Sequence, residues 1–440
     1  MHILQITNHG MHQWEVVPGL PDTGGQNIFV NMFSDALADL GFDITIVNRG
    51  GYPDPISGQL RRGIDRKDEH QRILYIEDGL EEFVRKEDMD ERLPYLVEDL
   101  KKRLSDDGTD IDIIISHYWD GAKLGVLFNE SLETPIPHYW VPHSLGAIKK
   151  GNLPPDQWGG LRIDERLAHE KRLVQQLDGI ASTSSLITNK LVDYYGYRGA
   201  VYFLPPCVDP ERYYPRTIPG DHEVWELLSN LSGLGISEIQ RRKIVTEISR
   251  TDITKRKDIL IKAFAKIIDL EPDSFLIVSI DEGRPQLARE LKGLIREFGL
   301  EKDVAAVGSV WDILPSIYAI SDIYCTPAIV EGFGMSAQEA AATQVPVIAS
   351  HRVPFVTEYL LGDEVDSITP PGLTEPLLFG IGAMVIQADD IEGFAYALEL
   401  MLTDDMLRAN MGRRAFHRTI PFFTWPRVTA DFLDQLHLDY

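Results

Sequence analysis

Cysteine is almost absent from this chain of 440 residues. Its two cysteines, Cys207 and Cys325, lie far apart in sequence and lack the C-x-x-C spacing of a zinc site. The shortage excludes a disulfide scaffold and favours a reducing compartment, so we expect a cytoplasmic protein.

Long apolar runs are also missing. No run approaches the ~20 residues that a membrane-spanning helix needs. The first residues, Met1–Thr7, lack the charged start and longer apolar core of a signal peptide, and they are typical of a short buried strand.

Positive charge is scarce. The sequence has 43 Lys and Arg residues against 68 Asp and Glu residues, a net charge of −25. Nucleic acids and anionic membranes bind dense positive charge, so we expect neither nucleic acid nor stable membrane association. An anionic substrate then needs a local basic pocket. The oligomeric state stays open.

Short apolar runs alternate with helical patterns along the whole chain. In the first half, strands are expected at 2–7, 42–48, 72–76, 111–116, 137–141, 179–182 and 201–204; in the second half, at 243–249, 274–280, 304–307, 322–325, 345–349 and 383–386. Helices are expected at 24–40, 84–103 and 257–270. This alternation predicts an α/β protein with two doubly wound, Rossmann-like domains. Prolines place the boundary near 204–215, and a less regular bridge is expected from there to about Gly235.

The first candidate motif is Pro21–Gln26, which reads P-D-T-G-G-Q and lies between the first strand and its helix. Paired glycines, Gly24 and Gly25, let the backbone approach a ligand, and a helix N-terminus offers N–H groups to an anion. A plain glycine turn explains the same residues equally well.

The second motif carries Arg250 and Lys255, in the loop that follows the first strand of the second domain. Fixed cations at that place stabilise a diphosphate leaving group as its bond to a sugar breaks. Taken alone, a solvated loop lysine is the simpler interpretation.

The third motif holds Glu331 in a glycine turn and Glu339 eight residues later in a helix. Ionised carboxylates accept hydrogen bonds from sugar and ribose hydroxyls. The alternative is an ordinary turn before an alanine-rich helix with a solvated glutamate.

The order and spacing of these motifs resemble retaining glycosyltransferases of family 4. The closest likeness is to the branch with sucrose synthase and sucrose-phosphate synthase, and His143-Ser-Leu-Gly146 and His117-Tyr-Trp-Asp-Gly121 resemble segments of that branch. Two departures put strict sucrose chemistry in doubt: glycine follows Glu331 where proline is usual there, and Cys207 stands where the linker usually has glycine.

The resemblance implies a GT-B fold, with two Rossmann-like domains facing each other across a cleft. Residues 1–210 would form the acceptor-side domain, with a C-terminal helix at 420–440 crossing back onto it, and 211–419 the donor-binding domain. It also implies site residues for the nucleotide sugar. They are Arg250 and Lys255 on the diphosphate, Glu331 and His143 on the hexose (His143 near O6), Glu339 on the ribose, and backbone at Gly24, Gly25, Phe333, Gly334, Met335 and Ser336.

The acceptor is expected to be small and polar. Candidate residues on the first domain are Gln26, Asp120, Lys149, Lys150, Arg162 and Arg166. Arginine and lysine there suit a phosphate or carboxylate, whereas an exposed, ion-paired helix is an equal alternative. Fructose 6-phosphate fits the nearest relatives, and an acidic acceptor leading to a glycosylglycerate-type compatible solute fits the acidic composition. UDP-glucose is the favoured donor, ahead of GDP-mannose and ADP-glucose.

No cofactor or essential metal is expected, because the resemblance is to metal-independent enzymes. The D-x-D pairs Asp88/Asp90 and Asp110/Asp112 are interpreted as surface residues and a strand start. We expect same-face substitution, since the motifs supply no nucleophilic carboxylate. Two other classes remain open: a nucleotide-sugar epimerase, which Glu331 and Glu339 disfavour, and a non-catalytic nucleotide-sugar sensor.

Overall fold

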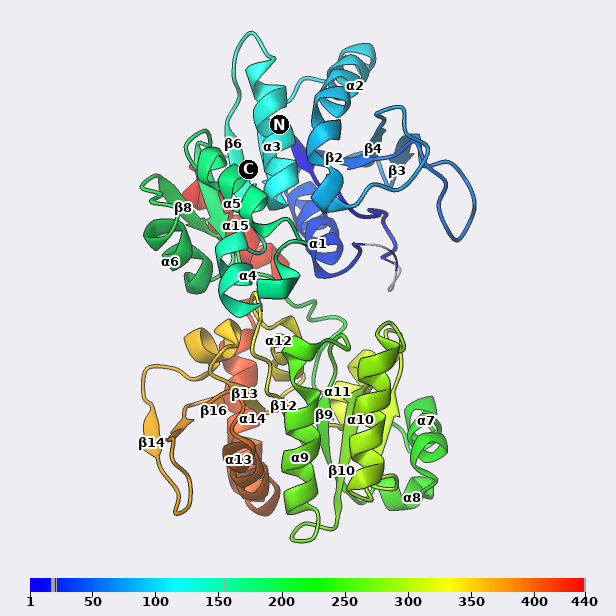
Figure 1. The fold of residues 1–440 in the computed structure, drawn as a ribbon, viewed down its shortest axis with the longest axis vertical. Coiled ribbons are helices and arrows are strands. Elements are labelled where there is room, and N and C mark those ends of the chain that lie inside the picture. Colours follow the sequence, from blue (N-terminus) through cyan, green and yellow to red (C-terminus); the bar gives the residue numbers. More distant parts are fainter. Residues whose placement is uncertain (17–19, 21, 154, 439–440) are drawn as a thin grey trace. The chain divides into compact units, whose positions relative to one another are not determined.

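The computed structural model describes residues 1–16, 20, 22–153 and 155–438. The chain divides into two compact units, each considered by itself: unit 1 holds Met1–Pro206 and Trp425–Tyr440, and unit 2 holds Cys207–Thr424. Among the described residues, no helix is both long and apolar enough to span a membrane. Both units are α/β, so the predicted fold class is confirmed (Figure 1).

Unit 1 is built on one eight-stranded sheet in the order β3-β4-β2-β1-β5-β6-β7-β8. Its strands are β1 His2–Ile6, β2 Asp43–Arg49, β3 Gly63–Arg66, β4 Gln71–Ile76, β5 Ile113–His117, β6 His138–Val141, β7 Gly179–Ser182 and β8 Ala200–Phe203. Its helices are α1 Gly25–Asp39, α2 Leu93–Asp107, α3 Tyr118–Glu130, α4 Gly146–Asn152, α5 Ile163–Leu173, α6 Ser185–Asp193 and α15 Trp425–Gln435, with short turns η1 Lys86–Asp88, η2 Asp90–Arg92 and η3 Pro155–Gln157.

Helix α15 packs on α1 within unit 1. The ring centroids of Phe29 and Trp425 are 4.9 Å apart and those of Phe33 and Phe432 are 5.9 Å apart. These edge-to-face aromatic contacts hold the C-terminal helix in place. Residues 439 and 440 of the segment predicted as helical lie outside the described residues.

Unit 2 has a second eight-stranded sheet, in the order β11-β10-β9-β12-β13-β16-β15-β14. Its strands are β9 Lys243–Glu247, β10 Ser274–Ser279, β11 Val304–Val307, β12 Ile323–Thr326, β13 Val347–Ser350, β14 Asp366–Ile368, β15 Leu377–Phe379 and β16 Ala383–Ile386. Its helices are α7 Glu223–Ser232, α8 Ile236–Ile239, α9 Lys257–Ile267, α10 Pro285–Glu297, α11 Leu314–Ile320, α12 Met335–Ala342, α13 Ile391–Thr403 and α14 Asp405–Thr419, with η4 Ile253–Lys255 and the π-helix η5 Val356–Leu360.

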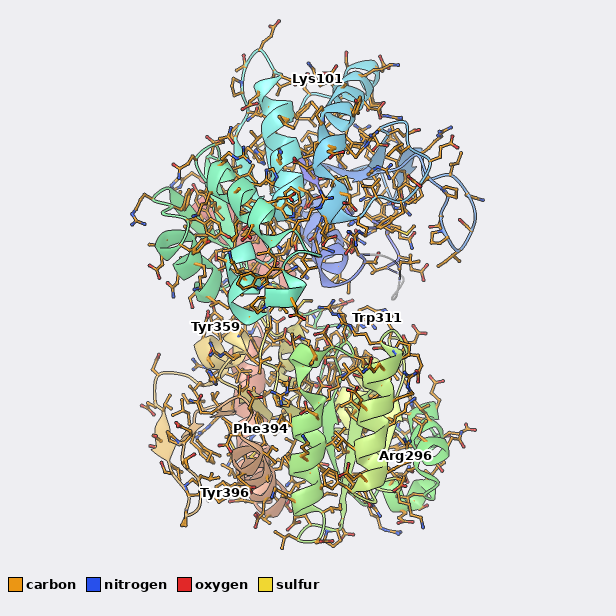
Figure 2. The ribbon with its side chains drawn as sticks, viewed as in Figure 1. Lys101, Arg296, Trp311, Tyr359, Phe394 and Tyr396 are labelled. Atoms are coloured by element: carbon orange, nitrogen blue, oxygen red, sulfur yellow. The ribbon has the colours of Figure 1, made fainter. Side chains whose placement is uncertain are left out.

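The central strands of unit 2 are buried on both faces. Phe275 and Ile277 of β10 pack with α7, α11 and α12, whereas Leu276 and Val278 pack with α9, α10 and α13. Phe394 of α13, labelled in Figure 2, is fully buried in the second layer. Continuous apolar runs are therefore explained by helices on both sides of the sheet.

Two sequence predictions are wrong in detail, and three strands were not predicted. The helix expected at 84–103 is two 3₁₀ turns followed by α2, because Pro94 is confined to the first turn of a helix. The bridge expected to be irregular contains α7, which buries Val224, Trp225 and Leu228 on one face. The antiparallel strands β3, β14 and β15 were not expected at all.

In each unit, the chain order reverses between two neighbouring parallel strands. β1 pairs with both β2 and β5 in unit 1, and β9 pairs with both β10 and β12 in unit 2. Ligands of open α/β sheets bind outside the carboxyl ends of the strands at such a switch point. The second and third candidate motifs directly follow β9 and β12, and the first lies at the end of the long loop between β1 and α1.

Candidate active site

Two loops meet at the switch point of unit 2. The loop after β9 carries Lys255, and the loop after β12 carries Glu331. Their backbones are joined where the Ile329 N–H donates to the Thr254 carbonyl at 2.8 Å. The buried Lys255 ammonium donates to the Glu331 carboxylate, so these two predicted residues are brought together.

Arg250 lies in the same loop and is exposed. The next residue is fixed twice to the end of β10: the Thr251 N–H donates to Asp281 Oδ2 at 3.1 Å, and the Asp281 N–H donates to Thr251 Oγ1 at 2.8 Å. In the described part of the chain, the Arg250 guanidinium forms no ion pair, which leaves it open to an anion.

Gly334 begins α12 in a conformation that only glycine adopts readily. Its φ is 113°, and a Cβ added there would lie 2.6 Å from Val353 Cγ1. The start of the helix therefore lies tightly against Val353, with the partly exposed Met335 and Ser336 in its first turn. The buried Phe333 ring packs against Phe355, and the Phe333 carbonyl accepts from the Phe355 N–H at 2.8 Å.

Glu339 is half-buried on α12, and its carboxyl group has an unusual environment. Burial raises its pKa to about 7, although Tyr318, Arg212 and Tyr213 favour the ionised form. A carboxyl group with this pKa exists in both protonation states near neutral pH.

Arg212 is a neighbour that the sequence did not single out. Its guanidinium stacks on the Trp311 ring, 4.6 Å from the centroid, and donates to the Trp311 carbonyl at 2.7 Å (Trp311 is labelled in Figure 2). Arg212 lies in the proline-rich segment before α7, and the sequence of that segment indicated a domain boundary but no ligand contact.

The switch point of unit 1 is formed by the loop after β1 and by the start of α3, which follows β5 directly. Gly24 is the N-cap of α1, and Gly25 is its first residue. Gln26 is held by the end of β1, where its Nε2 donates to Thr7 Oγ1 at 3.0 Å. Pro21, the first residue of this motif, lies outside the described residues.

Asp120 is completely buried in the first turn of α3. It accepts hydrogen bonds from Asn8 Nδ2 and His9 Nδ1, both at 2.8 Å. Burial opposes the charge of His9, yet Asp120 outweighs it and raises the His9 pKa. Asp120 thus fixes the loop after β1, and His9 is a further candidate residue that the sequence did not indicate.

His143 follows β6 in a tight three-residue turn. Its φ is 54°, and the Ser144 N–H donates to the Pro142 carbonyl at 2.5 Å. Such a conformation is strained for a residue with a side chain, and strain of this kind gathers at functional sites.

A chain of hydrogen bonds fixes which nitrogen His143 presents. Gln5 Nε2 donates to Ser34 at 2.7 Å, so Gln5 Oε1 accepts from His117 Nε2 at 2.9 Å. His117 Nδ1 must then accept from His143 Nε2 at 3.0 Å, which leaves His143 Nδ1 as an acceptor. Burial lowers the pKa of His143 to about 3, so the ring is neutral.

A pocket in unit 1 collects three of the predicted acceptor residues, Lys149, Arg162 and Arg166, and its lining also includes the acidic residues Glu87, Asp90 and Glu165. Tyr118, the first residue of α3, also lines the pocket, and its backbone has a φ of 64°. Lys149 Nζ donates to the Tyr118 hydroxyl at 2.9 Å, and Arg166 also donates to it. Burial opposes ionisation of Tyr118, but Arg166 and Lys149 outweigh it and lower its pKa to about 8.

The candidate cations differ in whether they are already ion-paired within the protein. Arg166 is buried and ion-paired with Glu170 at 2.7 Å, so it acts through Tyr118. Arg162 pairs with Asp88 at 2.9 Å, and Lys150 pairs with Asp164 at 2.6 Å outside the residues that line the pocket. Lys86 also lines the pocket and pairs with Asp22. The sequence did not indicate it, because the residues around it were interpreted as a charged surface helix.

Neither D-x-D pair gathers into a cluster. Asp90 accepts from Lys123, and Asp112 accepts from the His2 N–H at 2.7 Å. Within the described ranges, no group of three or more His, Cys, Asp or Glu side chains is arranged to hold a metal ion.

Comparisons with known proteins match both halves of the chain. Residues 23–212 match the model of Glycosyltransferase Family 4, and residues 236–418 match that of Glycosyl transferases group 1. Mannosylfructose-phosphate synthase of Agrobacterium fabrum is 25% identical over 98% of this chain and 90% of its own. D-inositol 3-phosphate glycosyltransferase of Corynebacterium aurimucosum is 26% identical over 96% of this chain and 92% of its own.

A solved structure shares the fold. Sucrose-phosphate synthase from Thermosynechococcus elongatus superposes with a TM-score of 0.78 at 23% identity, covering 99% of this chain and 98% of that one.

Proposed function

Since the chain belongs to glycosyltransferase family 4 and folds as a GT-B enzyme, we propose that it transfers a hexose from a nucleotide sugar to a small phosphorylated acceptor with retention of anomeric configuration. The favoured pair is UDP-glucose with fructose 6-phosphate. The observation that carries the proposal is the joined pair Lys255 and Glu331, with Arg250 beside it, at the switch point of unit 2.

Arg250 and Lys255 hold the donor diphosphate in this proposal. In the free protein Lys255 is paired with Glu331, so the arriving diphosphate becomes a second anion for the same ammonium. Glu331 then accepts hydrogen bonds from the hexose hydroxyls, and Glu339 accepts from the ribose. The N–H groups at the start of α12, and those at Gly24 and Gly25, complete the contacts to sugar and phosphate.

Bond exchange occurs on one face of the sugar. The bond from C1 to the diphosphate oxygen breaks, and the acceptor hydroxyl oxygen bonds to C1 from the same side. The hydroxyl proton passes to the leaving phosphate oxygen. Arg250 and Lys255 stabilise the charge that gathers on the diphosphate, which lowers the barrier. His143 Nδ1, a neutral acceptor, accepts from the O6 hydroxyl and holds the hexose.

The basic pocket around Tyr118 holds the acceptor phosphate. Lys149 and Arg162 supply the direct contacts, and Arg166 fixes Tyr118. Lys86, Lys149, Arg162 and Arg166 outnumber the carboxylates of Glu87, Asp90 and Glu165 in the lining. In a protein of net charge −25, such a local excess of cations favours a phosphate. The names of the two similar sequences reported above contain a phosphorylated product or substrate, which supports this acceptor class.

A mannosyl donor is the second candidate, because one similar protein is named a mannosylfructose-phosphate synthase. Nucleoside diphosphate release decides between the donors. UDP-glucose, ADP-glucose, GDP-glucose and GDP-mannose are each combined with fructose 6-phosphate, fructose, glycerate and 3-phosphoglycerate. Release that needs one donor and a phosphorylated acceptor supports the proposal. Nucleotide binding without release for any pair points to a sensor, and no nucleotide binding contradicts the proposal.

A further inference from the structure

A buried lysine lies directly beneath the turn that carries Arg250. Lys257 is 2% exposed, and its ammonium donates to the Ser249 carbonyl at 2.7 Å and to the Ser279 carbonyl at 2.5 Å. It also donates to Ser279 Oγ at 2.7 Å, and Glu247 Oε2 lies 3.3 Å away. One side chain therefore ties together the carboxyl ends of β9 and β10.

The position opposes a positive charge in two ways. Lys257 is the first residue of α9, where the helix dipole disfavours cations. Burial also lowers its pKa, although Glu247 raises it. The charge is offset by oxygen atoms that belong to the ends of the two strands, so the ammonium and these strand ends stabilise one another.

The same strand ends set the turn at Arg250. Ser279 Oγ donates to the Ser249 carbonyl at 2.6 Å and accepts from the Ser249 N–H at 2.9 Å. Thr251 is fixed to Asp281 on the other side. The backbone is thus held immediately before and after Arg250, whose guanidinium is exposed.

We propose that Lys257 is a positioning residue for Arg250: it locks the Ser249 and Ser279 carbonyls together and so holds the Arg250 guanidinium where the donor diphosphate binds, while Glu247 compensates its charge. This inference rests on the proposed function, which assigns the diphosphate to Arg250. Lys257 itself is too buried to touch substrate and acts through the turn.

The test is a double-mutant cycle on UDP affinity, measured by calorimetry with the full chain. Glu247→Leu combined with Lys257→Met removes both charges and keeps the volume, because buried ion pairs are often replaced by apolar residues at little cost in stability. Arg250→Ala is made in the native chain and in this double variant. Lys266→Met, on the same helix and paired with Glu392 at 2.8 Å, is the matched control.

In the native chain, Arg250→Ala weakens UDP binding by roughly tenfold or more. The double variant keeps a melting temperature near the native value, yet it loses most of the same affinity, and adding Arg250→Ala then changes little. Lys266→Met leaves the affinity and the Arg250→Ala effect unchanged.

Ser279→Ala provides a second variant that keeps the ion pair and removes one oxygen. It is expected to weaken UDP binding several-fold without lowering the melting temperature comparably. If Arg250→Ala weakens UDP binding as much in the double variant as in the native chain, the inference is overturned and the proposed function stands. If the double variant does not fold, native UDP affinity in Ser279→Ala has the same meaning. An Arg250→Ala variant with native UDP affinity overturns the proposed function and the inference with it.

Discussion

The ammonium of Lys255 donates a hydrogen bond to the carboxylate of Glu331, which joins the loop after β9 to the loop after β12. The two residues are 76 positions apart in sequence, and they meet because β9 and β12 are neighbouring parallel strands at a switch point. In the free protein each residue therefore neutralises the charge of the other.

Replacing Lys255 with methionine is expected to lower kcat by about 10²–10³-fold, because the leaving diphosphate loses a fixed cation. The KM for the acceptor should change far less. Steady-state kinetics with varied donor and acceptor check this, and Lys266→Met is the control on an exposed lysine. A Lys255→Met enzyme with native kcat would remove this residue from the chemistry.

UDP-glucose affinity is expected to rise by roughly tenfold between pH 6 and pH 8. Burial raises the pKa of Glu339 to about 7, and the ribose hydroxyls need the ionised carboxylate as acceptor. Of the groups that face it, burial raises the pKa values of Tyr213 and Tyr318 above this range. Calorimetry in buffers of different ionisation heat should show proton release on binding at pH 6.

Glu339→Gln is the matched variant for the pH profile. It should bind UDP-glucose weakly and with no pH dependence from 6 to 8. Stability should respond in the opposite direction. Because the pKa of Glu339 in the folded protein lies above its ordinary value of 4.5, its contribution to stability is present below pH 4.5 and is lost as the pH rises through about 7. Equal pH slopes in the two proteins would refute the assignment.

His143→Ala is expected to reduce kcat/KM for UDP-glucose by roughly ten- to hundredfold, since it removes the acceptor for the O6 hydroxyl. With UDP-6-deoxyglucose as donor, the native enzyme and the variant should be similar. Because burial lowers the pKa of His143 to about 3, the ring should contribute no titration between pH 5 and 9. A variant penalty that persists with the 6-deoxy donor would mean that His143 serves another group.

Lys149→Ala is expected to raise the KM for fructose 6-phosphate by roughly tenfold and to leave weak turnover of fructose nearly unchanged. The ratio of the two kcat/KM values isolates the contact to phosphate. Lys171→Ala, an exposed residue of α5 that stacks on Tyr194, is the control. An equal loss for both acceptors would place Lys149 outside the phosphate contacts.

The sequence was sufficient for the parallel strands and for the motifs that follow them. Strands such as β10 are continuous apolar runs because helices cover both faces. β3 and β14 were not predicted because they are short antiparallel strands at the sheet edges, exposed along most of their length, and carry no apolar run. β15 is apolar, but its three residues, Leu377–Phe379, are too few to mark a strand.

The residues of the candidate site could be predicted only in part, for a different reason. Tyr118 and Lys86 depend on tertiary contacts: one is defined by two cations from α4 and α5, and the other by a pocket formed by separate elements. Lys257 resembled any other charged residue at a helix start. Its role depends on oxygen atoms at the ends of two strands, which local sequence patterns do not reveal.

The most direct test of the central claim is proton NMR of the product made from UDP-glucose and fructose 6-phosphate by the purified protein, with UDP quantified in the same sample. The account predicts one α-glucosyl product for each UDP released, and no UDP without the acceptor. UDP release that ignores the acceptor, or a product with the β configuration, would contradict it.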